Sequence, residues 1–184
     1  MTVGQHSGVD DGVVSRISGT AKSHGFFLLP PILFAGHNLE EALSMYHWLK
    51  VAPYAPPFNA TQFAIGVFLL TLVGFCLYAF RWIGRGEYFG DVMMAFVCME
   101  FLNAFVPHIF ASVALFRYTP GLITSAILYV PAGLYLLIGS RRGTMPDLQW
   151  KHWILGAVIG ALGALVCLWA GIQIDTLLNA NDSV

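Results

Sequence analysis

The sequence predicts an all-α fold, a polytopic membrane helix bundle with five transmembrane helices. Composition is the first reason, because the 184-residue chain is 57% hydrophobic and only 10% charged, whereas soluble domains carry about 25% charged residues. The second is a series of apolar segments, each near the ~20 residues that cross a bilayer. Their approximate bounds are 26–49, 63–82, 92–116, 122–138 and 153–174. Lipid offers no partner for backbone N–H and C=O groups, so each span is expected to be helical.

The first apolar segment is the least regular of the five. It has Pro30-Pro31 near its start and the polar string HNLEE, residues 37–41, in its middle. It could therefore cross the bilayer, or be broken or re-entrant. Basic loop residues favour the crossing, because five spans place seven on one side and two on the other: Arg16, Lys22, Arg81, Arg85, Arg141, Arg142 and Lys151 against Lys50 and Arg117. The positive-inside rule then puts the N-terminus in the cytoplasm.

The later segments differ in polarity. The second, fourth and fifth are almost purely apolar, whereas the third contains MEFLNAFVPHIFAS, residues 99–112. Between the third and fourth, Tyr118-Thr119-Pro120-Gly121 suits a type II turn, with Pro and Gly at its two central positions. In the fifth, small residues form a close-packing face that serves either inside the bundle or as a homodimer seam. This face consists of Gly156, Gly160 and Gly163.

The remaining residues define the domain organisation. Residues 1–24 are Gly/Ser-rich and are expected to form a disordered cytoplasmic tail. A secretory signal is disfavoured, because Pro30-Pro31 interrupts the apolar run and no clear cleavage pattern follows. Residues 25–175 are expected to form one transmembrane domain, followed by a short C-terminal tail at 176–184. The net charge of −1 gives no basic surface for nucleic acid, so membrane lipids are the expected surroundings.

Three ionisable residues in the first segment need a reason to be there. A charged group near mid-membrane costs roughly 2.5–3.5 kcal/mol on insertion scales, so packing alone does not explain Glu40 and Glu41. At about 100° per residue, Glu40 lies about 60° to one side of His37 and Glu41 about 40° to the other. The three side chains therefore share one helix face, and an intramembrane site is the preferred interpretation over a purely structural cluster.

The third segment supplies the expected counterpart. Glu100 and Asn103 share a face, whereas His108 lies about 140° from Asn103 on an ideal helix. Pro107 removes a backbone hydrogen bond and is expected to kink the helix, which could bring His108 to the same side. Structural alternatives are a histidine bonded to a carbonyl, an asparagine that ties two helices together and a Glu100 that pairs with Arg81 or Arg117. Two imidazoles with two or three carboxylates suit zinc, or a non-haem iron or manganese ion.

These residues together resemble a known family. HNLEE, Asn103 followed by His108, and the Tyr118-Thr119-Pro120-Gly121 string are similar to the bacterial HXXEE membrane protein family. The likeness extends from about residue 26 to 140. It implies a small multi-span protein of the bacterial inner membrane with an enzymatic role, and it supplies no substrate.

The leading functional hypothesis is a membrane enzyme with its site between the first and third helices. In its metal-dependent form, a zinc, iron or manganese ion is held by His37, Glu41 and His108. Glu40 orients a ligand or acts as a general base, and Glu40 and Glu100 are further candidate ligands. Asn103 and Tyr118 are candidate catalytic residues beside Glu40 and Glu41. A lipid-like or apolar small substrate would enter sideways from the bilayer, and hydrolysis or hydroxylation would follow.

Three alternatives remain open at this stage. The same carboxylates and His37 could serve a metal-free acid–base isomerase or cyclase. A proton-coupled transporter also keeps Glu and His at membrane depth, although this sequence shows no inverted repeat. Haem could bind with His37 and His108 as axial ligands.

Overall fold

The computed structural model describes residues 28–53, 56–79, 86–145 and 147–181, and these residues form an all-α bundle without strands. The predicted fold class is confirmed. The described helices are α2 (Leu29–Leu49), α3 (Ala60–Ala79), α4 (Gly86–Asn103), η2 (Ala104–Phe110), α5 (Ala111–Leu115), α6 (Leu122–Thr124), η3 (Ser125–Tyr129), α7 (Val130–Arg141) and α8 (Trp150–Asn181). Two long helices each contain a π-helical stretch, so that α4–η2–α5 and α6–η3–α7 are both continuous. The predicted tail at 1–24 lies outside the described residues.

Four of the five long helices are apolar and long enough to cross a membrane, as expected of a multi-pass protein. They span Ala60–Ala79, Tyr88–Leu115, Leu122–Arg141 and Trp150–Ala180. The fifth, α2, has 21 residues and is thus about 31 Å long at 1.5 Å per residue. It does not meet the same apolarity criterion, because the HNLEE string lies in its middle. The helix is nevertheless unbroken, since Pro30 and Pro31 occupy its first turn, where proline's missing N–H has no intrahelical partner to lose.

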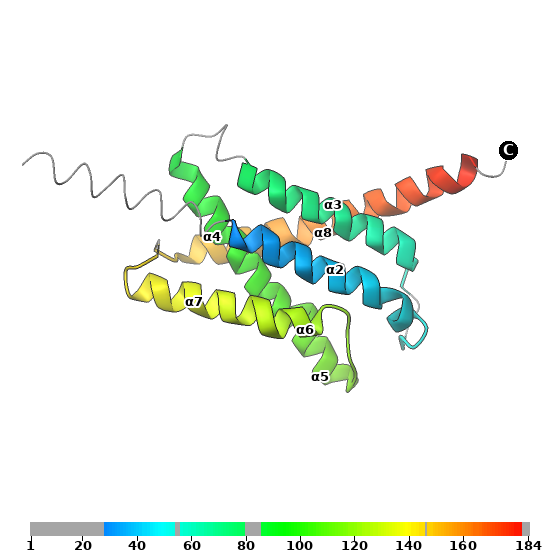
Figure 1. Cartoon of the computed structure of the whole chain (residues 1–184), viewed down its shortest axis with the longest axis horizontal. Helices are drawn as coiled ribbons and strands as arrows, with labels where there is room; N and C mark the ends of the chain where they lie inside the picture. Colours follow the sequence, from blue (N-terminus) through cyan, green and yellow to red (C-terminus); the bar gives the residue numbers. More distant parts are fainter. Residues whose placement is uncertain (1–27, 54–55, 80–85, 146, 182–184) are drawn as a thin grey trace, which may run out of the picture.

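The third helix is the centre of the bundle. In the span Tyr88–Leu115, 56% of the residues in its most apolar 18-residue stretch are buried, against 17% in the corresponding stretches of α3 and α8. Met93, Met94 and Phe96 of α4 form the core with Phe34 of α2 and Tyr129 of η3. Figure 1 shows α4 running obliquely across the other helices, with α2 and α3 side by side. The polar residues of α2 and of the third helix are therefore brought to the interior.

The last helix packs closely through its glycines. Gly156 and Gly160 lie against Met99 of α4, and Gly163 lies against Leu70 of α3. The predicted close-packing face is thus used within the chain. The helix also continues to Asn181, so most of the tail expected at 176–184 is helical.

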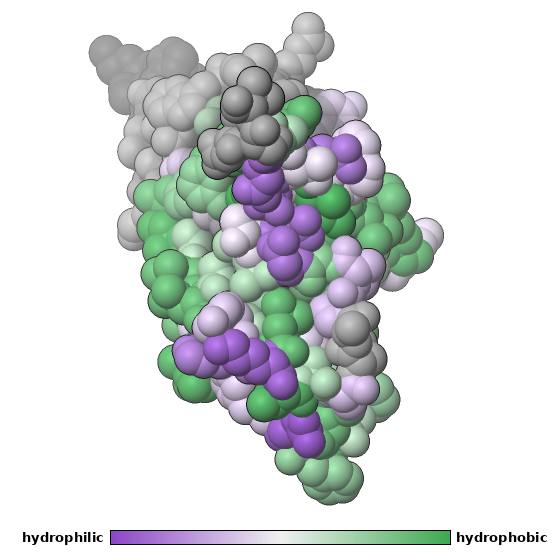
Figure 2. All heavy atoms as spheres, turned by 90° about the vertical axis from the view of Figure 1, so that its right-hand side faces the viewer, coloured by the Kyte–Doolittle hydropathy of each residue, from purple (hydrophilic) through white to green (hydrophobic). Residues whose placement is uncertain are grey.

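The outer surface is rich in large apolar side chains. Exposed examples occur on every long helix, including Leu43, Phe68, Val106, Ile127 and Leu165. At the end of the molecule seen in Figure 2, polar residues gather in the middle and apolar residues cover the flanks. This distribution suits a bundle surrounded by lipid.

One polar contact fixes α2 against α3. The Asn38 side-chain amide donates to Thr71 Oγ1 at 2.7 Å and to the Val67 carbonyl at 3.3 Å. Asn38 is adjacent to His37 in the chain, so this contact also helps to set the rotation of α2 about its axis. His37 and Glu41 consequently face the third and fourth helices.

Candidate metal centre

Three side chains from two helices converge at the centre of the bundle. His37 and Glu41 lie one turn apart on α2, and His108 comes from η2. Glu41 Oε1 lies 3.6 Å from His37 Nε2 and 3.4 Å from His108 Nε2. The side chains of His37 and His108 are 0% and 5% exposed, and that of Glu41 is 14% exposed. The predicted juxtaposition of the first and third helices is therefore present for these three residues.

The π-helix accounts for the position of His108. On an α-helix, Asn103 and His108 would point in very different directions. In a π-helix, hydrogen bonds join residues five apart, and η2 covers Ala104–Phe110 with Pro107 inside it. The Asn103 and His108 side chains accordingly meet, with Nδ2 of Asn103 3.2 Å from Nε2 of His108. The expected inward movement of His108 thus coincides with a π-helical stretch around Pro107.

The hydrogen bonds around His37 fix which of its nitrogens carries the proton. Thr124 Oγ1 donates its single hydrogen to Glu40 Oε2 at 2.5 Å, so it can only accept from His37 Nδ1, which lies 2.9 Å away. Neutral His37 therefore carries its proton on Nδ1 and presents a free lone pair on Nε2. Glu40 and Thr124 together prepare His37 to act as a ligand through Nε2.

His108 also faces Glu41. Nε2 of His108 lies 3.4 Å from Glu41 Oε1 and 3.2 Å from Asn103 Nδ2. Thr119 Oγ1 also bonds the His108 carbonyl at 3.1 Å. Both imidazoles thus present Nε2 to the same point.

Asn103 lies between the two histidines. Its Nδ2 is 3.2 Å from Nε2 of His37 and 3.2 Å from Nε2 of His108, so the two amide hydrogens can reach the two lone pairs. A half-turn of the amide would place Oδ1 there instead, where it could accept a hydrogen bond or bind a cation. Asn103 thus lies beside both histidines and joins α2 to η2.

Glu40 faces a different set of partners. Its Oε1 accepts from Tyr118 OH at 2.5 Å and from the Ile123 N–H at 3.2 Å, and its Oε2 accepts from the Thr124 N–H at 2.7 Å. With the Thr124 hydroxyl, four donors occupy one carboxylate at the beginning of the fourth helix. This is the end at which a helix has free N–H groups and a positive partial charge. Glu40 therefore anchors that helix and does not join the three converging ligands.

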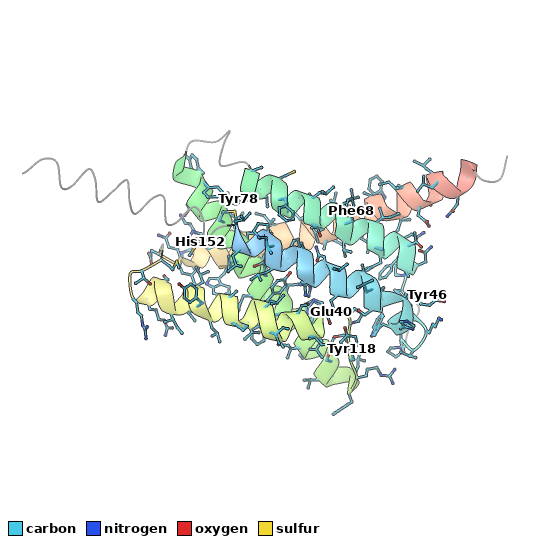
Figure 3. The ribbon with its side chains drawn as sticks, viewed as in Figure 1. Glu40, Tyr46, Phe68, Tyr78, Tyr118 and His152 are labelled. Atoms are coloured by element: carbon cyan, nitrogen blue, oxygen red, sulfur yellow. The ribbon has the colours of Figure 1, made fainter. Side chains whose placement is uncertain are left out.

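Tyr118, which donates one of these bonds to Glu40, lies in the loop between the third and fourth helices. Figure 3 shows Tyr118 below Glu40. Burial, together with the adjacent Glu40 carboxylate, raises the pKa of the Tyr118 phenol above its usual range. The phenol consequently stays a hydrogen-bond donor to Glu40 at neutral pH. Tyr118 was predicted as a catalytic residue, and in the structure it donates a hydrogen bond to Glu40.

Gly121 forms part of the wall of the site. Its φ of +81° and ψ of −4°, with the bond from Leu122 N–H to the Thr119 carbonyl, make the predicted type II turn. A Cβ at this position would lie 2.6 Å from Cε1 of His37 and 2.7 Å from Cε1 of His108. Only glycine satisfies both the backbone conformation and this close approach.

The remaining candidate ligand, Glu100, lies elsewhere. It is 1% exposed and lies outside the group formed by His37, Glu41 and His108, which is the only such group among the described residues. Sequence reasoning also missed Thr124 and Gly121 as site residues. The sequence does offer an indication for Thr124, because a hydroxyl residue stands shortly after the turn, near the start of a mostly apolar helix.

An apolar cavity opens onto the cluster. Its volume is about 520 Å³, and Glu41 and Asn103 form part of its wall. Most of the other lining residues are apolar or small, including Phe63, Val67, Leu70, Met99, Ala157, Ala161 and Leu168. This volume lies within the range of about 300–1,000 Å³ for small-molecule sites. An apolar molecule there would reach Glu41 directly.

The fold and this site define a multi-pass helical protein of membrane type with a buried histidine–glutamate cluster. A family model described as "Protein of unknown function with HXXEE motif" matches residues 28–136. Because the match covers more than half of the chain, the protein belongs to this family, and His37, Glu40 and Glu41 are the H, E and E of its motif. The chain is also similar to the uncharacterized protein YrkK of Bacillus subtilis (strain 168), with 22% identity over 125 residues that cover 67% of this chain and 78% of the relative. No solved structure matches the chain.

Proposed function

We propose that the protein is a membrane enzyme with a divalent metal ion held by His37, Glu41 and His108, acting on a lipid-like or apolar substrate. The observation that carries the proposal is the convergence of two Nε2 lone pairs and one carboxylate oxygen at one buried point. In His37 the other ring nitrogen, Nδ1, is already hydrogen-bonded to Thr124. Metal-binding histidines are typically oriented in this way by their second nitrogen.

The distances from the Glu41 oxygen to the two nitrogens suit a small metal ion, and all three ligand atoms lie within 4.8 Å of one another. Ligand atoms about 2.0–2.2 Å from a zinc ion in tetrahedral geometry lie roughly 3.3–3.6 Å from one another, and Glu41 Oε1 lies 3.6 and 3.4 Å from the two nitrogens. Three protein ligands with a free position are typical of catalytic sites. Zinc, iron and manganese are all compatible with this donor set. A bound divalent ion would polarise a substrate carbonyl or lower the pKa of a water molecule.

The protein's own residues would bind and orient the substrate. The apolar cavity would hold its hydrocarbon part, and Glu41, which lines the cavity, would lie at the reacting end. The Asn103 amide is adjacent and can donate to or accept from a polar group of the substrate. Because four donors already bind Glu40, we assign it the positioning of Thr124 and His37 in place of general-base catalysis.

The geometry does not favour the haem alternative. The rings of His37 and His108 are edge to face with their centroids 4.7 Å apart. Axial haem ligands lie on opposite faces of a porphyrin, and two rings in direct contact leave no room for one.

Elemental analysis of the detergent-purified protein tests the proposal. We expect one equivalent of zinc, iron or manganese in the wild type and its loss in His37→Ala and in His108→Ala. His47→Ala is the matched control, because His47 is an exposed histidine on the same helix and its removal should leave the metal in place. Stoichiometric metal in both single site variants would show that the ligand assignment is wrong. A wild-type protein without metal would favour the acid–base alternative.

A further inference from the structure

Buried polar groups without a hydrogen-bond partner also lie outside the metal cluster, and Glu100 of α4 is the acidic one among them. Both carboxyl oxygens of Glu100, Ser125 Oγ and Tyr129 OH have no hydrogen-bond partner among the described residues. The three residues are only 1%, 0% and 0% exposed. Burying polar groups without partners is costly, and most of all for a charge. A ligand that pairs with Glu100 would remove that cost for its carboxyl group.

Glu100 lines a cavity of its own. This cavity has a volume of about 230 Å³ and lies between α2, α4 and the fourth helix. Seven of its nine lining residues are aliphatic, and no Lys, Arg or His is among them. The full lining is Leu29, Pro30, Leu33, Val97, Glu100, Ile127, Leu128, Ala132 and Tyr135. Glu100 is therefore the one acidic group of an otherwise apolar chamber.

We propose that this cavity binds a small organic cation, a short-chain amine whose ammonium group pairs with Glu100. An ammonium group has three N–H donors, and the two Glu100 oxygens are unused acceptors. The aliphatic wall would bury the hydrocarbon part of the amine. A metal cation fits less well, because hard ions take six or more oxygen ligands and this wall is mostly carbon.

The amine site is separate from the metal centre. Tyr129 lies beside His37, with ring centroids 4.5 Å apart, and interacts electrostatically with Glu100. One aromatic residue thus lies between the two sites. Neutralising Glu100 should leave the metal ligands in place, so the proposal does not depend on the proposed enzyme.

Ligand-detected NMR on the full chain in lipid nanodiscs tests the proposal. Hexylamine is the probe, and hexanol and hexanoate are its neutral and anionic counterparts. We expect saturable hexylamine binding to the wild type, weakened at least about tenfold in Glu100→Gln, which removes the charge and keeps the shape. Ala132→Leu should also weaken binding by filling the cavity. Asp175→Asn, at another buried carboxylate, should bind as the wild type does.

Three results would overturn the proposal. They are equal binding of hexanol and hexylamine, unchanged hexylamine affinity in Glu100→Gln, and no saturable binding to the wild type. If Glu100→Gln does not fold, Ala132→Leu decides, because it leaves the carboxyl group intact. Metal content measured on the same samples keeps the two proposals distinguishable, since only the His37 and His108 variants should lose metal.

Discussion

The two adjacent acids of the HXXEE motif have different partners. Glu41 faces His37 and His108, whereas Glu40 accepts four hydrogen bonds at the beginning of the fourth helix. A helix turns about 100° per residue, so neighbouring positions can serve two different helices. The spacing of the motif therefore places one ligand pair, His37 and Glu41, one turn apart, and leaves Glu40 to support it.

Thr124 should control metal affinity without touching the metal. Its hydroxyl joins Glu40 to His37 Nδ1, and removal of such outer partners typically lowers metal affinity about 10–100-fold. We expect this loss in Thr124→Val, which keeps the shape and removes the hydroxyl. The measurement is a competition titration of the purified protein with a metal-binding dye.

Thr124→Ser is the matched control for this prediction, because it restores the hydroxyl and should retain near wild-type affinity. Equal affinities in the Val and Ser variants would show that the hydroxyl does not orient His37. A loss in the Ser variant alone would indicate that the methyl group, through packing, is what matters, because Val keeps that methyl group.

Tyr118 should make the stability of the folded state fall as the pH rises in the alkaline range. Its pKa is raised by burial and by Glu40, so the folded state retains the phenol proton above the unfolded value near 10. The contribution of Tyr118 to stability is then complete below pH ~10 and is lost as the pH rises through the raised pKa. Tyrosinate absorbance should show one late-titrating group fewer in Tyr118→Phe than in the wild type. Loss of an ordinary or early-titrating group in that variant would contradict the prediction.

At the scale of elements, the π-helix is the feature that sequence reasoning could not supply. Asn103 and His108 were both predicted, but their five-residue spacing fits one face only when the helix widens. Pro107 marks the place, because it removes an N–H from the regular α-helical pattern, yet kinks and π-bulges are both possible consequences of such a residue. The choice between them depends on tertiary contacts, here a hydrogen bond from Thr119 Oγ1 to the His108 carbonyl.

A substitution in the turn before the fourth helix tests whether the close approach of Gly121 to the two histidines is needed for metal binding. Gly121→Ala would put a methyl group into contact with both imidazoles in addition to the cost of a positive φ, about 1–2 kcal/mol for a residue with a side chain. We expect Gly121→Ala to lose metal and to lower the unfolding temperature. Metal content and thermal unfolding measured together check this.

Gly143→Ala is the control for Gly121→Ala. Gly143 also has a positive φ, of 68°, but a Cβ there has open space around it. Gly143→Ala should therefore lose only the stability that a side chain costs at a positive φ, and it should keep its metal. If the two variants behave alike, the close approach of Gly121 to the histidines has no consequence for the site.

For the whole molecule, apolar periodicity predicted the helices well and their ends less well. The last helix was expected to end near residue 174, because Asp175 and the polar residues after it are unfavourable in a span. In the structure, Asp175 accepts hydrogen bonds from Asn59 and Gln62 at the beginning of α3, and α8 continues to Asn181. A residue satisfied by a distant segment cannot be recognised from its own neighbourhood in the sequence.

The metal, if bound as proposed, should stabilise the bundle as a whole. Its ligands come from α2 and η2, so an ion would join the first helix to the central one. A ligand that binds only the folded state stabilises it by about 2.7 kcal/mol at a hundredfold excess over Kd. We therefore expect added zinc to raise the unfolding temperature of chelator-treated wild type and of His47→Ala, and to have no effect on His37→Ala. The rise should shrink as the pH falls, because the ligands must be deprotonated to bind. An equal rise in His37→Ala would place the stabilising ion somewhere other than this cluster.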